Sequence, residues 1–319
     1  MTGVSSRDVL VHVGYHKTGT TWLQRVLFKR TAVGLRAAAA KYQLHPLLVH
    51  PRAIDFDAAG AKCELGALVE AAARDGSYPV VSSEELCGSP HTGGVLEKEF
   101  ADRIAAVLPG ARILVVVREQ KAMLVSSYKQ YVRAGGILSL ETYLSPRLLG
   151  DVRSCNPDWR HFRYDALVDY YRRLFGPDRV LVLSYEGFVA QPADFVRRVL
   201  GFCGLERGDE EIESLPFERD VHASLGALGV EIKRRLNPWV SRPDRLYAEP
   251  FFPVTNSAHR RLVKVFRRLE SAAPARLARW REERFHRVVE RWAGDRFRAS
   301  NSRLGEWMED DLAKLGYDL

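Results

Sequence analysis

Two patterns of apolar and polar positions alternate along the first two thirds of the chain. Short, nearly continuous apolar runs, typical of strands covered on both faces, occur at "DVLVHVG" (8–14), "YPVVSS" (78–83), "ARILVVVR" (111–118) and "RVLVLSY" (179–185). Segments with helical spacing follow at residues 19–30, 95–110, 121–133 and 191–204. Strands alternating with helices predict an α/β fold with a central parallel β-sheet flanked by helices, whose ligands bind at the carboxyl ends of the strands.

The pattern changes in the last third of the chain. Residues 259–270 and 276–292 interleave apolar and charged side chains at helical spacing, which predicts amphipathic helices. Two less regular stretches, at residues 134–163 and 207–257, contain glycines, prolines and aromatic residues. They are where we expect lids or acceptor-binding loops.

Length and composition indicate a globular protein. We expect one domain over residues 1–319, with an α/β core at 1–205 and a mostly helical carboxyl-terminal portion at 206–319. No apolar run approaches the ~20 residues of a membrane span, and the first residues, "MTGVSSRD", contain no apolar signal-peptide segment. The default expectation is therefore a cytoplasmic protein.

Charge and cysteine content add two limits. The formal net charge of +8 indicates anionic partners, but much of the excess is arginine on the predicted amphipathic helices. The charge is therefore a weak guide to the acceptor, and no nucleic-acid partner is expected. The cysteines lie far apart without metal-ligand spacing, so we expect single buried thiols and neither disulfides nor a zinc site; they are Cys63, Cys87, Cys155 and Cys203.

The stretch "GYHKTGTTW" (14–22) joins the first predicted strand to the first predicted helix. A glycine-containing turn there exposes backbone N–H groups, and the helix dipole adds positive potential. Lys17 adds a mobile charge, Gly19 lets the backbone approach a ligand closely, and Thr20 and Thr21 add hydroxyl donors. These features together predict a cradle for a phosphate-like anion.

This cradle is not the Walker sequence GxxxxGK[ST], because its lysine precedes the glycine. It resembles the 5′-phosphosulfate loop of the sulfotransferases that use 3′-phosphoadenosine-5′-phosphosulfate (PAPS), including bacterial-type members. The resemblance implies a P-loop NTPase-like sulfotransferase fold and a set of nucleotide contacts from the loop, namely Lys17, Thr18, Gly19, Thr20, Thr21 and Trp22. For Trp22 a packing role in the core is the favoured alternative.

Two further motifs resemble the same family. Arg118 closes the third predicted strand, and Ser126 follows eight residues later in a predicted helix. The family uses such a pair to bind the 3′-phosphate of the nucleotide. The segment "VLVLSYEGFVAQPADFVRRVLGFCGL" resembles a later strand, Tyr-Glu turn and helix, which implies that Tyr185 contacts the nucleotide. Packing at a strand end is the alternative for Tyr185.

The resemblance implies in-line transfer of a sulfuryl group from PAPS to a hydroxyl or amine, leaving adenosine 3′,5′-bisphosphate. The acceptor is then a small molecule, a glycan or a lipid, and no metal takes part. Catalysis of such a transfer rests mostly on positioning and electrostatics. Lys17 and the loop amides would stabilise the charge that builds on the leaving phosphate oxygen.

A general base must accept the proton of the acceptor. "PVVSSEEL" places Glu84 and Glu85 after the second predicted strand. Ser82 and Glu85 have capping-box spacing, which gives Glu85 a structural explanation. Glu84 has none and is the favoured base, at about the position where related enzymes carry a histidine or a glutamate. Glu85, His16 and His222 remain alternatives.

The resemblance thins beyond residue 205. Cytosolic members of the family carry a late Gly-rich basic segment that closes over the nucleotide, and here "HASLGALGVEIKRR" (222–235) is the nearest substitute, with Ser224 and Lys233 as candidate contacts. Two other functions stay open. A nucleotide kinase should show the Walker order and a magnesium carboxylate, whereas a non-catalytic PAPS-binding protein would keep Lys17 and Arg118 without a base.

Overall fold

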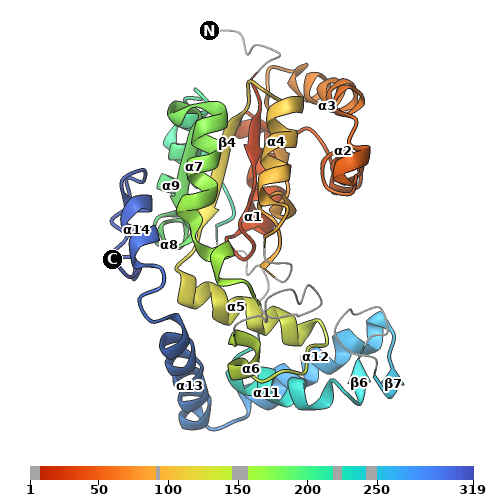
Figure 1. The fold of residues 1–319 in the computed structure, drawn as a ribbon, viewed down its shortest axis with the longest axis vertical. Coiled ribbons are helices and arrows are strands. Elements are labelled where there is room, and N and C mark those ends of the chain that lie inside the picture. The colour runs from red at the N-terminus through yellow and green to blue at the C-terminus, as the bar shows by residue number, and fades with distance from the viewer. Residues whose placement is uncertain (1–7, 91–93, 146–156, 218–224, 242–249) are drawn as a thin grey trace.

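A computed structural model describes residues 8–90, 94–145, 157–217, 225–241 and 250–319. An α/β part containing a parallel sheet lies above a helical part in Figure 1. The five-stranded sheet has the order β2-β3-β1-β4-β5 with every neighbouring pair parallel. Its strands are β1 Leu10–His12, β2 Leu35–Ala37, β3 Tyr78–Ser82, β4 Arg112–Val117 and β5 Val180–Ser184. The predicted α/β fold is confirmed.

The sheet is buried on both faces because its strands are apolar at successive positions. On β4, Leu114 and Val116 pack with one cluster of buried residues, while Ile113, Val115 and Val117 pack with the other. Successive side chains of a strand point to opposite faces. A strand covered by helices on both sides therefore needs the continuous apolar run that the sequence shows.

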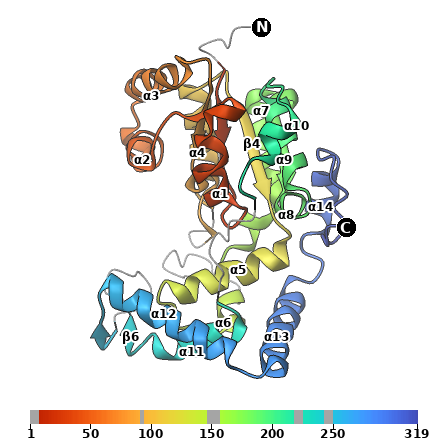
Figure 2. The same ribbon diagram turned by 180° about the vertical axis from the view of Figure 1, so that it is seen from behind.

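Helices form a layer on each face of the sheet. Helices α4 and α7 lie in front of the sheet in Figure 1, and α1 and α9 lie in front of it in the opposite view of Figure 2. The helices of the α/β part are α1 Thr20–Arg25, α2 Lys41–Leu48, α3 Ala58–Ala73, α4 Glu97–Val107, α7 Tyr164–Phe175, α8 Tyr185–Ala190, α9 Pro192–Phe202 and α10 Asp209–Glu213.

Helix α5 connects the sheet to the helical part. It follows β4 directly, and the Glu119 carboxylate caps its first turn by accepting from the N–H groups of Lys121 and Ala122. Helices α11 and α13 pack against α5, while α14 returns to α7 of the α/β part. This group comprises α5 Gln120–Arg133, α6 Leu140–Leu144, α11 Ala227–Leu236, α12 Asn256–Ser271, α13 Ala275–Ala293 and α14 Arg298–Gly305, with a short pair of strands, β6 Val240–Ser241 and β7 Phe252–Pro253.

Most predicted elements are found, but the structure also contains elements that were not predicted, among them the helices α2, α3 and α7. The edge strand β2 was not predicted, because it has only three residues and precedes an alanine run. The predicted helix 19–30 ends at Arg25 and continues as a 3₁₀ turn, Leu27–Lys29, after Val26 adopts a φ of −113°. Helices α10 and α11 lie within the stretch 207–257, and α6 lies within 134–163, both of which we had expected to be irregular.

The cysteine prediction is wrong for one residue. Cys87 and Cys203 are buried free thiols. Cys63 is exposed, because it lies on the face of α3 that does not pack against the core. Cys155 lies outside the described residues. Within the part of the chain that the structure describes, none of the helices combines the length and the apolar character needed to cross a membrane.

Candidate functional site

The register of the sheet brings three strand ends to one edge. Strand β1 lies between β3 and β4, with His12 opposite both Ser82 and Leu114. On the other side of β4, Val117 pairs with Ser184 of β5. Parallel strands present their carboxyl ends to the same edge of a sheet. The loop after β1 therefore lies between the turn after β3 and the turns after β4 and β5.

The loop after β1 has the strained backbone of a ligand-binding turn. Lys17 has a φ of 63°, a left-handed conformation that costs a residue with a β-carbon about 1–2 kcal/mol. The hydroxyl of Thr18 donates to the carbonyl of Tyr15 at 2.5 Å and so holds the turn closed. At Gly19, with a φ of 79°, a β-carbon would lie 3.2 Å from the Phe188 ring. Such strain persists only where the surrounding structure imposes it, and it is concentrated at functional sites.

Arg118 connects the loop to the end of β5. Its Nη1 donates to the carbonyl oxygen of Lys17 at 3.2 Å, and its guanidinium carbon lies 4.7 Å from the centre of the Tyr185 ring. The Arg118 Nε is buried and has no hydrogen-bond partner among the described residues. The structure thus brings three residues of separate predicted motifs into contact.

Lys17 lies in a positively charged environment. Desolvation of its ammonium lowers the pKa of Lys17, and the charges of Arg133 and Arg118 lower it further, while Glu84 acts in the opposite direction. Repulsion among three cations means that the local potential is positive. An anion bound among them would relieve that repulsion.

Glu84 begins the 3₁₀ turn Glu84–Cys87 that follows β3, and this turn lies against the loop after β1. A β-carbon at Gly14, which has a φ of 98°, would lie 3.1 Å from the Glu84 Cα. The Gln24 side chain donates to Glu84 Oε2 at 3.3 Å, and the Lys41 ammonium lies 3.6 Å from Oε1. These contacts place the carboxylate beside the cradle.

Burial would raise the pKa of Glu84, but other groups outweigh it. The backbone N–H of Glu84, the charges of Lys41 and His16 and the hydrogen bond from Gln24 together lower this pKa below its ordinary value. The carboxylate is therefore ionised at neutral pH and able to accept a proton. A low pKa also weakens its driving force as a base, so its position has to supply part of the effect.

The predicted capping box of Ser82 and Glu85 is wrong. The cap is Ser83, whose hydroxyl accepts from the Glu85 N–H at 3.2 Å. Ser82 is the last residue of β3, and its hydroxyl instead bonds to His12 Nδ1 at 2.8 Å. Glu85 still has structural partners, because its carboxylate contacts the Lys41 ammonium at 2.7 Å and His45 Nδ1 at 3.6 Å.

The other residues that we predicted as nucleotide contacts do not all lie at the cradle. Trp22 is 2% exposed, donates to the Pro216 carbonyl and stacks on Phe217, so its side chain has the packing role that we favoured. Ser126 is half-buried in the second turn of α5. Lys233 is buried in the helical part, where it donates to Asn237, away from the cradle.

His222 and Ser224, which we considered as an alternative base and a nucleotide contact, lie outside the described residues. His16 lies close to the buried Cys87, with 3.8 Å between its Nδ1 and the thiol sulfur. Within the described ranges, no group of three or more His, Cys, Asp or Glu residues is placed to hold a metal ion.

Three residues of the site were missed in the sequence. Gln24 lies on α1, Lys41 begins α2 and Arg133 ends α5. None of them belongs to a motif, and each reaches the site only through the packing of its helix. No local pattern distinguishes Gln24 and Arg133 from the other polar residues of the same helices, and their partners depend on the order of the strands.

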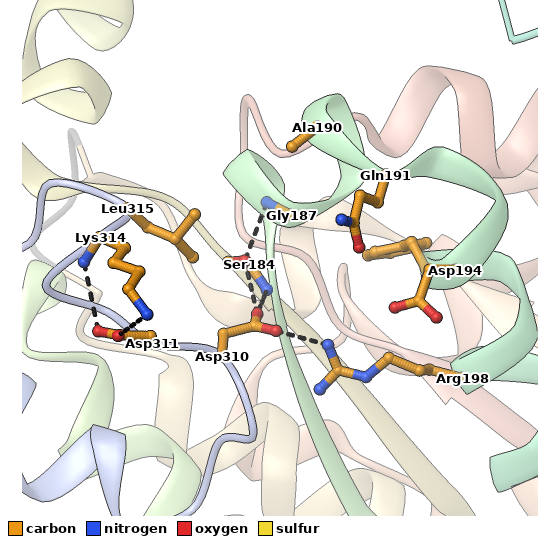
Figure 3. Close-up of a pocket in the computed structure, with 11 residues that line it drawn as sticks. Ser184, Gly187, Ala190, Gln191, Asp194, Arg198, Asp310, Asp311, Lys314 and Leu315 are labelled. Carbon is orange, nitrogen blue, oxygen red and sulfur yellow. Dashed lines mark hydrogen bonds and ion pairs between the residues drawn. The ribbon is translucent and has the colours of Figure 1, made fainter.

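A separate cavity of about 230 Å³ lies beside the start of α8. Figure 3 shows that Asp310 of the carboxyl-terminal segment lies between Ser184 and Arg198 at this cavity. Its lining carries charged side chains that pair with one another, including Lys314 with Asp311. Among the described residues that line it, none is a site residue predicted from the sequence.

A family model and a curated protein match parts of this sequence. A family model described as "Sulfotransferase family" matches residues 97–209, which include Arg118, Ser126 and Tyr185 but neither Lys17 nor Glu84. The human heparan sulfate glucosamine 3-O-sulfotransferase 6 is 32% identical over 111 residues, which are 34% of this chain and 32% of that protein. The chain therefore aligns with about a third of the length of this curated relative.

Solved structures of sulfotransferases give weaker matches. A sulfotransferase from Alicyclobacillus acidocaldarius has a TM-score of 0.48 at 19% identity, covering 67% of this chain and 85% of its own. The sulfotransferase domain of the Synechococcus PCC 7002 olefin synthase has a TM-score of 0.41 at 14% identity, covering 82% and 94%. Mouse sulfotransferase SULT7A1 complexed with PAP has a TM-score of 0.37 at 14% identity, covering 94% and 89%. The two sequence matches each cover about a third of the chain, and they support the sulfotransferase family that its motifs predicted.

Proposed function

We propose that this protein transfers a sulfuryl group from PAPS to an acceptor hydroxyl or amine by in-line displacement. The observation that carries the proposal is the junction of Lys17, Arg118 and Tyr185, where a guanidinium touches both the phosphate-type loop and an aromatic ring. An arginine at this position suits a phosphate group, because a guanidinium forms strong charge-assisted hydrogen bonds to phosphate oxygens.

Each residue then has one task. Lys17 and the loop N–H groups stabilise negative charge on the leaving oxygen. Arg118 and Ser126 bind the 3′-phosphate and Tyr185 contacts the nucleotide, so that together they fix the direction of attack. Glu84, ionised and held by Gln24 and Lys41, accepts the proton of the acceptor.

A cytoplasmic location, the absence of a metal and the division at residue 205 stay predictions.

The acceptor is proposed from the sequence relative. Its printed name describes transfer to a sugar hydroxyl of heparan sulfate, so glucosamine-containing glycans come first in an acceptor panel, followed by lipids and small phenols. The net charge of +8 is compatible with an acidic glycan.

Turnover with labelled PAPS tests the proposal. We expect the whole chain to transfer the label to at least one acceptor, and Lys17→Met to abolish transfer while the protein stays folded by circular dichroism. Lys29→Met, on an exposed 3₁₀ turn, is a matched control that should keep full activity. Transfer that required ATP and magnesium instead of PAPS would favour a kinase, and tight nucleotide binding without any turnover would indicate a non-catalytic binding protein.

A further inference from the structure

Glu186 joins the two turns that carry Arg118 and Tyr185. It directly follows Tyr185 in sequence, and its Oε1 accepts a hydrogen bond of 3.1 Å from the backbone N–H of Glu119, which directly follows Arg118. One carboxylate thus links the ends of β4 and β5 behind the stacked pair. A hydrogen bond to a charged group is stronger than one between neutral groups, so this link restrains both turns.

The carboxyl-terminal segment holds the same carboxylate from the other side. The hydroxyl of Tyr317 donates to Glu186 Oε2 at 3.1 Å. Tyr317 is 4% exposed, and burial raises its pKa well above the ordinary value, so the hydroxyl keeps its proton and remains a donor. Glu186 therefore has a partner on each oxygen, one from the end of β4 and one from the last residues of the chain.

Asp310 attaches the same segment just before Tyr185. Its Oδ2 accepts from the backbone N–H of Ser184 at 3.1 Å and from the Ser184 hydroxyl at 2.6 Å. Its Oδ1 accepts from Arg198 of α9 at 2.5 Å, as Figure 3 shows. The residues on both sides of Tyr185 are thus fixed by side chains that lie more than a hundred residues later in the chain.

Arg118 is held from its backbone as well. The Tyr164 hydroxyl donates to the Arg118 carbonyl at 2.8 Å, and Lys121, in the first turn of α5, forms an ion pair of 2.9 Å with Asp318. Among the described residues, the guanidinium itself donates to one acceptor, the Lys17 carbonyl, and it packs on the Tyr185 ring. Its direction therefore depends on the relative placement of the two turns that Glu186 connects.

We propose that Glu186 and Tyr317 are positioning residues that set the Arg118 guanidinium over Tyr185 for contact with a 3′-phosphate. The inference rests on the proposed function, because it names what orients the nucleotide-binding pair of that site. Neither residue touches the nucleotide in this account. Loss of the Tyr317 hydroxyl lets the two turns shift, which weakens the contact to the 3′-phosphate and leaves the 5′ side, held by the loop after β1, as it was.

The ratio of two affinities tests the inference. Adenosine 3′,5′-bisphosphate and AMP differ only in the 3′-phosphate. The dissociation constant of AMP divided by that of the bisphosphate therefore isolates that contact. We expect Tyr317→Phe to reduce the ratio roughly threefold to tenfold, the range for one hydrogen bond, with little change in the affinity for AMP. Tyr170→Phe is the matched control, because it removes a hydroxyl that donates to the carboxylate of Asp102 away from the site.

A double-mutant cycle separates positioning from general destabilisation. If Tyr317 acts through Arg118, then Tyr317→Phe should have no further effect on the ratio in an Arg118→Ala background. Glu186→Gln is the second variant if Tyr317→Phe fails to fold. It should reduce the ratio, because glutamine is uncharged and can replace only one of the two carboxylate oxygens that accept hydrogen bonds.

The possible results lead to different conclusions. A wild-type chain with equal affinity for both nucleotides overturns the proposed function and this inference with it. A wild-type chain that discriminates, together with Tyr317→Phe and Tyr170→Phe variants of unchanged ratio, overturns the inference alone. An equal loss of thermal stability in both variants with an unchanged ratio would assign Tyr317 a structural role only.

Discussion

Glu84 and Glu85 carry the same side chain in different surroundings. Glu84 lies against the loop after β1 and takes a hydrogen bond from Gln24, whereas Glu85 turns to Lys41 and His45 of α2. Both carboxylates share Lys41, so removal of either charge disturbs the same ion pair. This makes the two residues a matched pair for mutation.

Glu84→Gln should keep the nucleotide affinity and lose turnover by about 10²–10⁴-fold, the typical contribution of a positioned base. The amide preserves shape and removes basicity. Glu85→Gln should keep most of its turnover and lose at most about 1 kcal/mol of stability, as for an exposed ion pair. Steady-state kinetics and thermal unfolding of both variants measure these effects. If the two variants exchange behaviours, Glu85 is the base; if both stay active, neither is.

Arg118→Ala should raise the Michaelis constant for PAPS about ten- to a hundredfold with little change in kcat. A contact to a remote phosphate exists in the ground state and the transition state alike, so its loss affects binding and not the chemical step. Arg179→Ala is the control, since Arg179 also donates to a backbone carbonyl, that of Gly110, at an exposed position. Normal affinity with lost turnover would contradict the role of Arg118.

The residues of the site differ in how far sequence could predict them. Lys17, Arg118 and Tyr185 each follow a strongly apolar run, so the strand ends that carry them were visible. The partners that connect them were not, because Glu186 and Tyr317 are separated by 131 positions. The cap of the turn after β3 was assigned to Ser82, and only the structure shows that the serine hydroxyl of Ser83 takes that role.

At the scale of elements, buried strands were predictable and the edge of the sheet was not. Strands β1, β3, β4 and β5 lie in nearly continuous apolar runs because both of their faces are covered. Strand β2 needs only three residues at the edge of the sheet, and no local pattern marks it. The order of the strands could not be predicted from a local pattern either. This order places the turns after β3 and β4 on the two sides of the loop after β1.

The contact between α4 and the 3₁₀ turn Trp159–Phe162 gives a prediction about pH. Glu97 and His161 share a hydrogen bond. Burial, with Asp158 second, raises the pKa of Glu97 from 4.5 to about 8, and burial lowers the pKa of His161 from 6.5 to about 3 despite Asp158. At neutral pH the pair is therefore a carboxylic acid that donates to a neutral imidazole.

The sign of the effect follows from proton binding. Between about pH 6.5 and 8 the unfolded chain has an ionised Glu97, while the folded chain keeps the proton. The free energy of unfolding must then fall as pH rises, by at most about 1.4 kcal/mol per pH unit. Below about pH 6.5 His161 acts in the opposite direction, because its folded form binds fewer protons than the unfolded form.

Thermal unfolding across this pH range measures the effect. We expect the melting temperature of the wild type to fall between pH 6.5 and 8, and Glu97→Gln to flatten that part of the profile. Glu99→Gln changes a residue of the same helix that pairs with Arg103 and should leave the slope as it is. Identical slopes in all three proteins would show that Glu97 is ionised in the folded state.

At the level of the whole molecule, residues from both ends of the sequence lie at the candidate site. The loop after β1 supplies Lys17 within the first twenty residues, and the segment that contains Asp310 and Tyr317 supports the end of β5. Figure 1 shows the carboxyl terminus beside α14 and near α8. The cations Lys17, Arg118 and Arg133 come from the loop after β1, the end of β4 and the end of α5, and together they make this region positive.

Because these three cations supply the positive charge that a metal brings in nucleotide kinases, we expect sulfuryl transfer to persist in EDTA. The assay compares initial rates with labelled PAPS before and after chelation, and then after magnesium is added back. An EDTA-treated protein that loses activity and recovers it with magnesium would point to metal-dependent chemistry. A rate that chelation leaves unchanged agrees with charge stabilisation by the protein alone.

The proposed function requires that the strand ends bind a nucleotide with a 3′-phosphate. Titration calorimetry of the whole chain with adenosine 3′,5′-bisphosphate, and in parallel with AMP, tests it most directly. A charge-assisted hydrogen bond contributes about 1.5–3 kcal/mol, so we predict that the bisphosphate binds at least about tenfold more tightly. Equal affinities for the two nucleotides, or binding of neither, would contradict the account.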